Sequence, residues 1–482
     1  MRSLAGAGLV ALLMLVGCDD CGRQLIEVDD DAGRDANGQD ASAADHASGA
    51  DQQPALDHAP VDIGSSDRAG NDSARGDAGF ADRSGGADRS SNDLCPAGLL
   101  GQRLDRDQLL VGGSMEDVSF AAQPFDLNYR YLAGAVPEDG TCNLCTDQSC
   151  TAAGLPCSDN SCPWWGCWQW VALEPGRYVA DHIDHVAGLG GIPMITYYVW
   201  LEAADATEGG DEVTRFNNAT LLRPYLQDFR FLCQVIGEQP ATPTILHLEP
   251  DLWGYAEQVN SDPTQIAAAL SGTGITECSG QPNTLVGLTH CLIILARQYA
   301  PNALIGFHAS AWGAGHDALG EAPTYFDVAD HARTTAAFYR ALGADQADLI
   351  VVEMSDRDAG YYESLGRGNW WDPLNVTPPH FHQAILWVQT LSQELALAAL
   401  WWQVPYGNMN LLDLCDATHS EYRDNRVDYF FDHPAEFAAG NALGIAFGAG
   451  TSCQTTAETD HGHFLQRAGQ YFAGGRPLLC GP

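Results

Sequence analysis

The sequence predicts an α/β fold, a (β/α) barrel of seven or eight strands, which is rich in disulfide bonds and preceded by a disordered linker. Short apolar runs rich in Ile, Val and Tyr alternate with amphipathic stretches, the pattern of parallel βαβ units. Seven such repeats are visible, and an eighth, weak strand would close a barrel. Polar residues follow the apolar runs, where a barrel builds its site. An open, doubly wound sheet is the alternative, which the repeat number and the polar positions disfavour.

The elements follow from this alternation of short apolar runs with longer amphipathic segments. The expected strands are 126–133, 192–201, 242–248, 303–308, 347–353, 396–403 and 442–447. The expected helices are 176–187, 221–236, 283–299, 331–342, 380–394, 434–441 and 461–472. Residues 94–482 are therefore expected to form one barrel domain.

The N-terminus has the features of an export signal. Arg2 supplies a positive charge, and the apolar run 9–16 is too short to span a bilayer. Leu15-Val16-Gly17-Cys18 resembles the bacterial lipoprotein cleavage signal, which implies that residues 1–17 are removed and that Cys18 carries acyl chains. An ordinary secretory signal is the alternative. The resemblance predicts an exported protein that is lipid-anchored to the cell envelope, at the outer membrane or cell surface, with no transmembrane helix.

Residues 18–93 are predicted to be a disordered tether. They consist mainly of Asp, Ala, Gly, Ser and Arg, with almost no aromatic residues. Such a segment buries too little apolar surface to offset the entropy of ordering it. Asp recurs every five residues from Asp57 to Asp82, but this period matches no known calcium loop, so a solvated tether is favoured over calcium repeats.

The 15 cysteines of an exported chain are expected to form disulfides. Six of them lie in an insertion at 142–170, together with four tryptophans. The pair Cys142 and Cys145 has zinc-like spacing, but no matching Cys/His pair follows, so a disulfide-stapled loop is favoured over zinc. The tryptophans of this insertion either pack against the disulfides or stack on sugar rings.

The net charge is −40, and all 23 basic residues are arginines. Nucleic acid is excluded as a partner, because phosphate binding requires a basic surface. A neutral polysaccharide or oligosaccharide fits this composition better. We expect a monomer without cofactor or metal, in contact with the membrane only through its lipid anchor.

Side chains that can transfer protons or bind a substrate lie at the ends of several expected strands. They are Glu202, Glu249, Asp251, His308, Glu353 and Gln403. Because parallel strands of a barrel end at one face, these groups are expected to converge. Each one taken alone has an alternative role as a helix cap or as the partner of an arginine.

The stretch Ile245-Leu246-His247-Leu248-Glu249-Pro250-Asp251-Leu252-Trp253 carries the most specific signal. It resembles the E-P-D-S-L signature of family 6 glycoside hydrolases. The later Phe307-His308-Ala309-Ser310-Ala311-Trp312-Gly313 is similar to that family's D-A-G-H-A-G-W-L-G-W stretch, and the resemblance covers about residues 190–320. It implies that Asp251 is the general acid of an inverting glycosidase, in which a second carboxylate activates water.

The sequence departs from that family at the base. Glu202-Ala203-Ala204-Asp205 stands where the family has R-D-C, and His308 stands where it has Asp. Glu202, Glu353 and Asp356 are the candidate bases, and Glu353 is favoured because it ends an apolar strand.

A retaining mechanism is the alternative. Leu248-Glu249-Pro250 is similar to the N-E-P context of retaining barrel glycosidases, which would make Glu249 the acid/base and Glu353 the nucleophile. The separation of the two carboxyl groups decides between the mechanisms.

Aromatic and polar residues at or near the strand ends are expected to bind sugar. They are His247, Tyr198, Trp200, Trp253, His308, Trp312, Trp402, Gln403, Tyr406 and Asn408. Together these features predict a surface-tethered glycoside hydrolase that uses carboxylate acid/base catalysis. A non-catalytic glycan-binding lipoprotein with a degenerate site is the alternative.

Overall fold

The computed structural model describes residues 95–481 except 135, 137–150, 153–154, 157–167, 171–174, 321–325, 356, 368, 417 and 451–452. The predictions for residues 1–17, Cys18, the tether 18–93, Asp356 and most of the insertion 142–170 therefore lie outside the described residues. Among the described residues, no helix combines the length and apolar character needed to span a bilayer.

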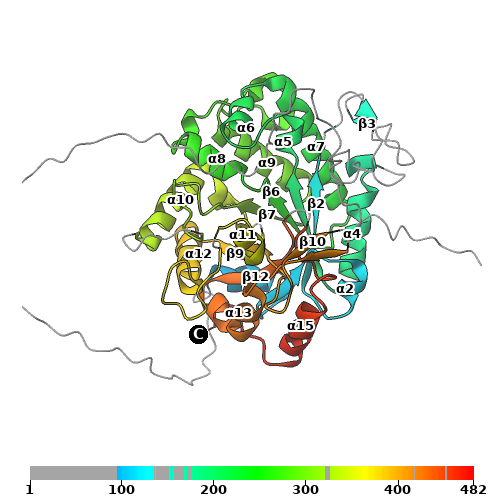
Figure 1. Cartoon of the computed structure of the whole chain (residues 1–482). Helices are drawn as coiled ribbons and strands as arrows, with labels where there is room; N and C mark the ends of the chain where they lie inside the picture. The colour runs from blue at the N-terminus through cyan, green and yellow to red at the C-terminus, as the bar shows by residue number, and fades with distance from the viewer. Residues whose placement is uncertain are drawn as a thin grey trace, which may run out of the picture. The chain divides into compact units, whose positions relative to one another are not determined.

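Eight parallel strands close into a barrel, which confirms the predicted fold class (Figure 1). Around the barrel the strands are β1 (Leu110–Gly113), β2 (Leu127–Ala133), β5 (Ile192–Tyr198), β6 (Thr244–Leu248), β7 (Ala303–His308), β8 (Leu349–Glu353), β9 (Ala398–Val404) and β12 (Ala442–Phe447). The eighth strand is β1, which pairs with β12 on one side and with β2 on the other. Every barrel strand is almost wholly buried, because helices cover the outside and side chains fill the inside.

Helices follow the strands along the chain and surround the barrel (Figure 1). The longer ones are α4 (Arg177–Gly188), α7 (Ala219–Gly237), α9 (Leu285–Tyr299), α10 (Val328–Leu342), α12 (Phe381–Leu395) and α15 (His463–Ala473). The shorter ones are α1 (Pro96–Arg103), α2 (Asp117–Ala121), α5 (Trp200–Ala203), α6 (Gly210–Arg215), α8 (Leu252–Val259), α11 (Ala359–Ser364), α13 (Arg426–Asp432) and α14 (Pro434–Ala439). Small antiparallel pairs are formed by β3 (Thr151–Ala152) with β4 (Leu155–Pro156), and by β10 (Leu414–Asp416) with β11 (His419–Glu421).

The described residues contain three disulfides, Cys95–Cys480, Cys278–Cys291 and Cys415–Cys453. Cys95–Cys480 joins the two ends of the barrel domain across 385 residues. Backbone hydrogen bonds lie beside it, from Leu109 N to Pro477 O at 3.0 Å and from Leu479 N to Asp107 O at 2.8 Å. The final segment is thereby held against the chain that leads into β1.

Replacing both Cys95 and Cys480 with serine is expected to lower the free energy of unfolding by about 2–5 kcal/mol, because the cross-link restricts the unfolded chain over a long loop. Urea denaturation followed by circular dichroism measures this loss. The matched control replaces Cys415 and Cys453, whose separation is only 38 residues, and a smaller loss is expected. Equal losses in the two variants would contradict the loop-length argument.

Candidate active site

Three neighbouring strands bring two carboxylates and an imidazole together at their C-terminal ends. Asp251 follows β6, His308 ends β7, and Glu353 ends β8. One ligand-type atom from each of these residues lies within 4.8 Å of those of the other two. His308 Nε2 is 3.9 Å from Asp251 Oδ1. Three of the strand-end residues that the sequence singled out therefore meet at one face of the barrel.

The backbone after β6 decides which acid reaches this cluster. Glu249 and Asp251 have φ angles of 45° and 66°, in the left-handed region that non-glycine residues rarely adopt. This turn directs Glu249 into the core, where it is only 1% exposed, and leaves Asp251 partly exposed at the first turn of α8. Such strained positions occur preferentially at functional sites.

Glu249 belongs to the structural core and lies outside the cluster. Its carboxylate accepts hydrogen bonds from the backbone amides of Val199 and Trp200 at 3.2–3.4 Å. Burial raises its pKa to about 8, and the hydrogen bonds from Tyr225, Trp200 and Val199 oppose that rise. Glu249 thus holds the turn after β5 against β6, in contrast to the acid/base role that the retaining alternative gave it.

Two buried histidines support the cluster from inside the barrel. His308 Nδ1 is 3.1 Å from His247 Nε2, and His247 Nδ1 is 3.2 Å from Thr196 Oγ1. Burial lowers the pKa of His308 to about 3 and that of His247 well below its ordinary value, so both rings are neutral. A neutral ring has one donor and one acceptor nitrogen, so the hydrogen bonds from His308 through His247 to Thr196 fix the orientation of His308.

Glu353 is oriented by an amide from the next strand. Gln403 Nε2 donates a hydrogen bond to Glu353 Oε1 at 3.1 Å, and the Tyr131 hydroxyl donates to Gln403 Oε1. Burial, followed by nearby charges that include Glu353, raises the pKa of Tyr131, so its hydroxyl stays protonated. The hydrogen bonds from Tyr131 through Gln403 therefore orient the Glu353 carboxylate.

A β-bulge in β9 makes this arrangement possible. The register between β9 and β12 shifts between the pairs Trp401–Ile445 and Val404–Phe447, and Gln403 has a φ of 54°. Successive residues of a regular strand face opposite sides, but a bulge redirects a side chain. Here Trp402 and Gln403 both face the barrel interior. The Trp402 ring lies 4.8 Å from the ring of His247 and 5.6 Å from that of His308, measured between centroids, and forms the floor of the site.

Partly exposed aromatic rings border the carboxylates. Tyr198 ends β5 and donates a hydrogen bond to Glu208 Oε1 at 2.8 Å. Tyr255, one turn into α8, contacts Trp312 with 4.6 Å between ring centroids. Burial raises the pKa of Tyr255, and the negative charges of Asp251 and Glu353 contribute to that rise, which places the ring in the field of both acids. Aromatic faces of this kind suit the C–H faces of pyranose rings.

Several residues predicted to act at the site lie elsewhere. Glu202 is exposed on α5 and is not among the clustered acids. Trp200 and Trp253 are fully buried, and each donates its indole N–H to a backbone carbonyl, of Glu212 and Leu248 respectively, at 3.0 Å. These two rings have packing roles, because no face is open to a ligand.

Tyr406 and Asn408 also pack inside the domain. The Tyr406 hydroxyl donates to Ser114 O at 2.9 Å, and Asn408 Nδ2 donates to Asp460 O at 3.0 Å. Both side chains are buried and join the loop after β9 to its neighbours. Sequence position alone placed them at a strand end, and the structure shows them supporting the loop.

Tyr131 and Tyr255 were missed by the sequence analysis. Tyr131 lies within β2 and not at its end, and Tyr255 lies four residues after Asp251 on a helix. The spacing of Tyr255 from Asp251 is one helical turn, which is a signal that a search beyond the strand ends would have found.

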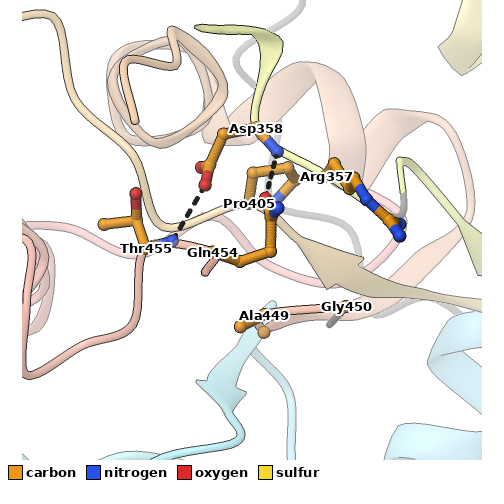
Figure 2. A pocket seen from close by; sticks show the side chains of 8 residues that line it. Arg357, Asp358, Pro405, Ala449, Gly450, Gln454 and Thr455 are labelled. Carbon is orange, nitrogen blue, oxygen red and sulfur yellow. Dashed lines mark hydrogen bonds between the residues drawn. The ribbon is translucent and has the colours of Figure 1, made fainter. Parts of the chain in front are cut away.

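The loops after β8, β9 and β12 are locked together by buried polar groups. Asp358 accepts a hydrogen bond from Thr455 N at 2.9 Å, and its own amide donates to Gln454 at 3.0 Å (Figure 2). Asp358 also accepts a hydrogen bond from Gly407 N at 3.0 Å. The small pocket in Figure 2 lies among these loops and is lined by Asp358, Pro405 and Gln454, not by the clustered acids. These hydrogen bonds hold Asp358 of the loop after β8 to the two other loops.

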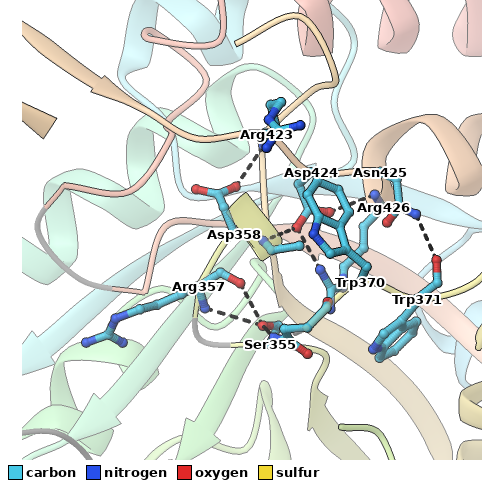
Figure 3. A network of polar contacts seen from close by, with 12 residues as sticks. Ser355, Arg357, Asp358, Trp370, Trp371, Arg423, Asp424, Asn425 and Arg426 are labelled. Carbon is cyan, nitrogen blue, oxygen red and sulfur yellow. Dashed lines mark hydrogen bonds and ion pairs between the residues drawn. The ribbon is translucent and has the colours of Figure 1, made fainter. Parts of the chain in front are cut away.

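An ion pair anchors the same network (Figure 3). Arg426 Nη1 lies 2.6 Å from Asp424 Oδ2, and both side chains are fully buried. Asp424 also accepts from the amide of Ala359 at 2.7 Å, and Arg426 donates to Asn369 O at 3.0 Å. Burial raises the pKa of both Asp358 and Asp424, and the negative charge of Asp424 adds to the rise at Asp358.

Glu257 of α8 is a buried acid without an assigned role. Its Oε2 has no hydrogen-bond partner among the described residues, and burial raises its pKa to about 8. At pH values between 4.5, which is the ordinary pKa of the group, and about 8, Glu257 keeps its proton in the folded protein but loses it in the unfolded chain. Its contribution to stability therefore falls as the pH rises through this window.

Glu257→Gln is expected to raise the free energy of unfolding by about 1–3 kcal/mol at pH 9 and to change it little at pH 5. Chemical denaturation at the two pH values measures this difference. A gain of the same size at both pH values would show that packing, and not the charge, is responsible.

Comparisons with known proteins give only distant similarities. No family model matches the chain, and no curated protein matches it. Among solved structures, a GH5-4 broad-specificity endoglucanase from an uncultured bacterium is 12% identical with a TM-score of 0.37, covering 74% of this chain and 83% of its own. The catalytic domain of a GH26 endo-β-1,4-mannanase from Bacillus sp. JAMB-750 is 12% identical with a TM-score of 0.39, covering 80% and 91%. The cellobiohydrolase Cel6A from Humicola insolens is 14% identical with a TM-score of 0.29, covering 48% and 59%.

Proposed function

We propose that this protein is a glycoside hydrolase that cleaves a neutral polysaccharide with Asp251 and Glu353 as its two catalytic carboxylates. The observation that carries the proposal is their meeting, within 4.8 Å, at the C-terminal face of a closed barrel. Most glycoside hydrolases cleave the glycosidic bond with such a pair of acids, one on either side of the bond. The bordering rings of Tyr198, Tyr255 and Trp312 provide surfaces on which sugar rings stack.

The short separation favours retention of configuration. Retaining enzymes place the two carboxyl groups about 5–5.5 Å apart, whereas inverting enzymes leave about 6.5–9.5 Å for a water molecule. Here one oxygen of Asp251 and one oxygen of Glu353 lie within 4.8 Å of each other, a closest approach that fits the retaining spacing. The proposed assignment takes one residue from each mechanism that the sequence suggested. Asp251 is the acid, as in the inverting alternative, and Glu353 is the nucleophile, as in the retaining alternative.

The proposed reaction has two steps. Asp251 donates a proton to the glycosidic oxygen as the Glu353 carboxylate attacks the anomeric carbon, so the bond to the leaving group breaks and a glycosyl ester forms. The Asp251 carboxylate then removes a proton from water, whose oxygen attacks the anomeric carbon and releases Glu353. The amide of Gln403 holds Glu353 in place for attack.

The test is release of reducing sugar from a panel of β-glucans, β-mannans and xylans by the purified full chain. Release with retained anomeric configuration, read by proton NMR of the first product, supports the proposal. Inverted product contradicts the nucleophile role of Glu353. If the protein releases no sugar but still pulls down insoluble glycan, the non-catalytic binding alternative holds. The lipid anchor at Cys18 and the surface location stay predictions.

A further inference from the structure

The cluster that contains the proposed catalytic pair also has the donor set of a transition-metal site. Asp251, His308 and Glu353 each present one ligand atom, and these atoms lie within 4.8 Å of one another. One imidazole nitrogen and two carboxylate oxygens match the ligands that zinc prefers, with bonds of about 2.0–2.2 Å. Tetrahedral ligands at that length lie about 3.4 Å apart, so the donor atoms need to move by only about 1 Å to close on an ion.

A second observation comes from His308. Its ring is completely buried, and its Nε2 atom has no hydrogen-bond partner among the described residues. That nitrogen is directed at Asp251 Oδ1, at 3.9 Å. A buried polar atom without a partner is costly, and a bound ion is one of the ways in which a protein satisfies it.

The hydrogen bond on the other side of His308 prepares the ring for a metal. If His308 Nδ1–H donates to His247 Nε2, then His247 Nδ1–H donates to Thr196 Oγ1, and both contacts have suitable lengths of 3.1 and 3.2 Å. This arrangement leaves the lone pair of His308 Nε2 free to bind an ion. Metal-binding histidines usually hold their second nitrogen in this way, which fixes the tautomer and the ring orientation.

We infer that Asp251, His308 and Glu353 bind one divalent transition-metal ion of the zinc type, and that the bound ion blocks the carboxylate pair. A carboxylate that coordinates zinc neither carries the proton that Asp251 must donate nor offers the lone pair with which Glu353 must attack. Three protein ligands leave a fourth position for water, as in an open zinc site. The blocking part of this inference rests on the proposed function, whereas the binding part does not.

The experiment titrates chelator-treated full-length protein with Zn²⁺ by calorimetry and with Co²⁺ by visible absorption. One ion per chain and the d–d absorption bands of nitrogen- and oxygen-bound Co²⁺ are expected. Glu353→Gln and His308→Ala should each weaken binding by more than about 100-fold. Because His308 is buried, thermal unfolding checks that its variant folds, and the partly exposed Glu353 gives an independent variant. His419→Ala is the matched control, since His419 Nδ1 lies 2.9 Å from Asp416 on the surface.

The outcomes separate this inference from the proposed function. Absence of stoichiometric binding, or binding that survives both variants, overturns the inference and leaves hydrolysis to be judged by sugar release. Binding that is lost in both variants but kept in His419→Ala supports the binding part, even if no sugar is released. Where sugar is released, Zn²⁺ should inhibit release with the affinity measured by calorimetry. Release that instead requires Zn²⁺ contradicts both the blocking role and the proposed acid.

Discussion

Asp251→Asn is expected to lower turnover on the preferred polysaccharide by about 10²–10⁴-fold while leaving the fold intact. An amide cannot donate the proton that the leaving oxygen needs, yet it keeps the shape of the carboxyl group. Asp251 is partly exposed at the start of α8, and asparagine has nearly the same size and shape, so the core packing should stay unchanged. The measurement is the initial rate of reducing-sugar release, with circular dichroism to confirm folding. An aryl glycoside, whose leaving group needs less protonation, should show a smaller loss.

Glu202→Gln provides the matched control. Glu202 also follows a strand and was a candidate acid from the sequence, but it is exposed on α5 and outside the cluster. Its variant should keep the turnover of the unmodified protein. Near-normal turnover in Asp251→Asn, or an equal loss in Glu202→Gln, would remove Asp251 from the acid role.

Arg426→Met is expected to destabilise the protein by about 3–5 kcal/mol at neutral pH, because it leaves the Asp424 carboxylate buried without its partner. Asp358 lies in the same network, and the negative charge of Asp424 contributes to its raised pKa. The Arg426 guanidinium also lies over the Trp371 ring, with 4.8 Å from its central carbon to the ring centroid, and methionine keeps part of that packing. Urea denaturation at several pH values measures the loss.

The pH dependence of the Arg426→Met variant distinguishes charge from packing. Burial raises the folded-state pKa of Asp424 above its ordinary value of 3.8, and loss of Arg426 raises it further. Below that ordinary value both states are protonated, so the penalty is small, and it grows as the pH rises towards the folded pKa. The double variant with Asp424→Asn should recover most of the stability at neutral pH. A penalty that does not change with pH would assign the effect to lost packing.

The fold could be predicted because seven of the eight strands are recognisable apolar runs separated by amphipathic helices. The strand β1 gave no such signal, since Leu110–Gly113 has four residues and two of them are glycines. Those glycines are required by close contact, because a Cβ at Gly112 would lie 1.8 Å from Leu127 O. Glycines that allow two strands to come close add nothing to a hydrophobic pattern. A strand that contains them is therefore recognised only once the strands that pair with it are known.

The site could be predicted only in part. Asp251, His308, Glu353 and Gln403 were found because parallel strands end at one face. The choice between Glu249 and Asp251 depended on two left-handed residues, which no pattern of residue types indicates. Tyr131 faces the site from within β2, because the stagger of a barrel brings residues of different depth to one level. Trp200 and Trp253 are of the residue type that stacks on sugar rings, but both faces of each indole ring are buried.

The extra residue in β9 has a consequence for any attempt to redesign the protein. Deleting Gln403 would remove the bulge, so that successive side chains of β9 would again face opposite sides of the sheet. The Trp402 ring would stay at the floor of the site. The amide that binds Glu353 would be lost, and Val404 would follow Trp402 directly. A change in the length of this strand by one residue thus alters the polarity of the site without any substitution in it. The count of residues between Ala398 and Val404, rather than their identity alone, sets the chemistry that β9 presents to a ligand.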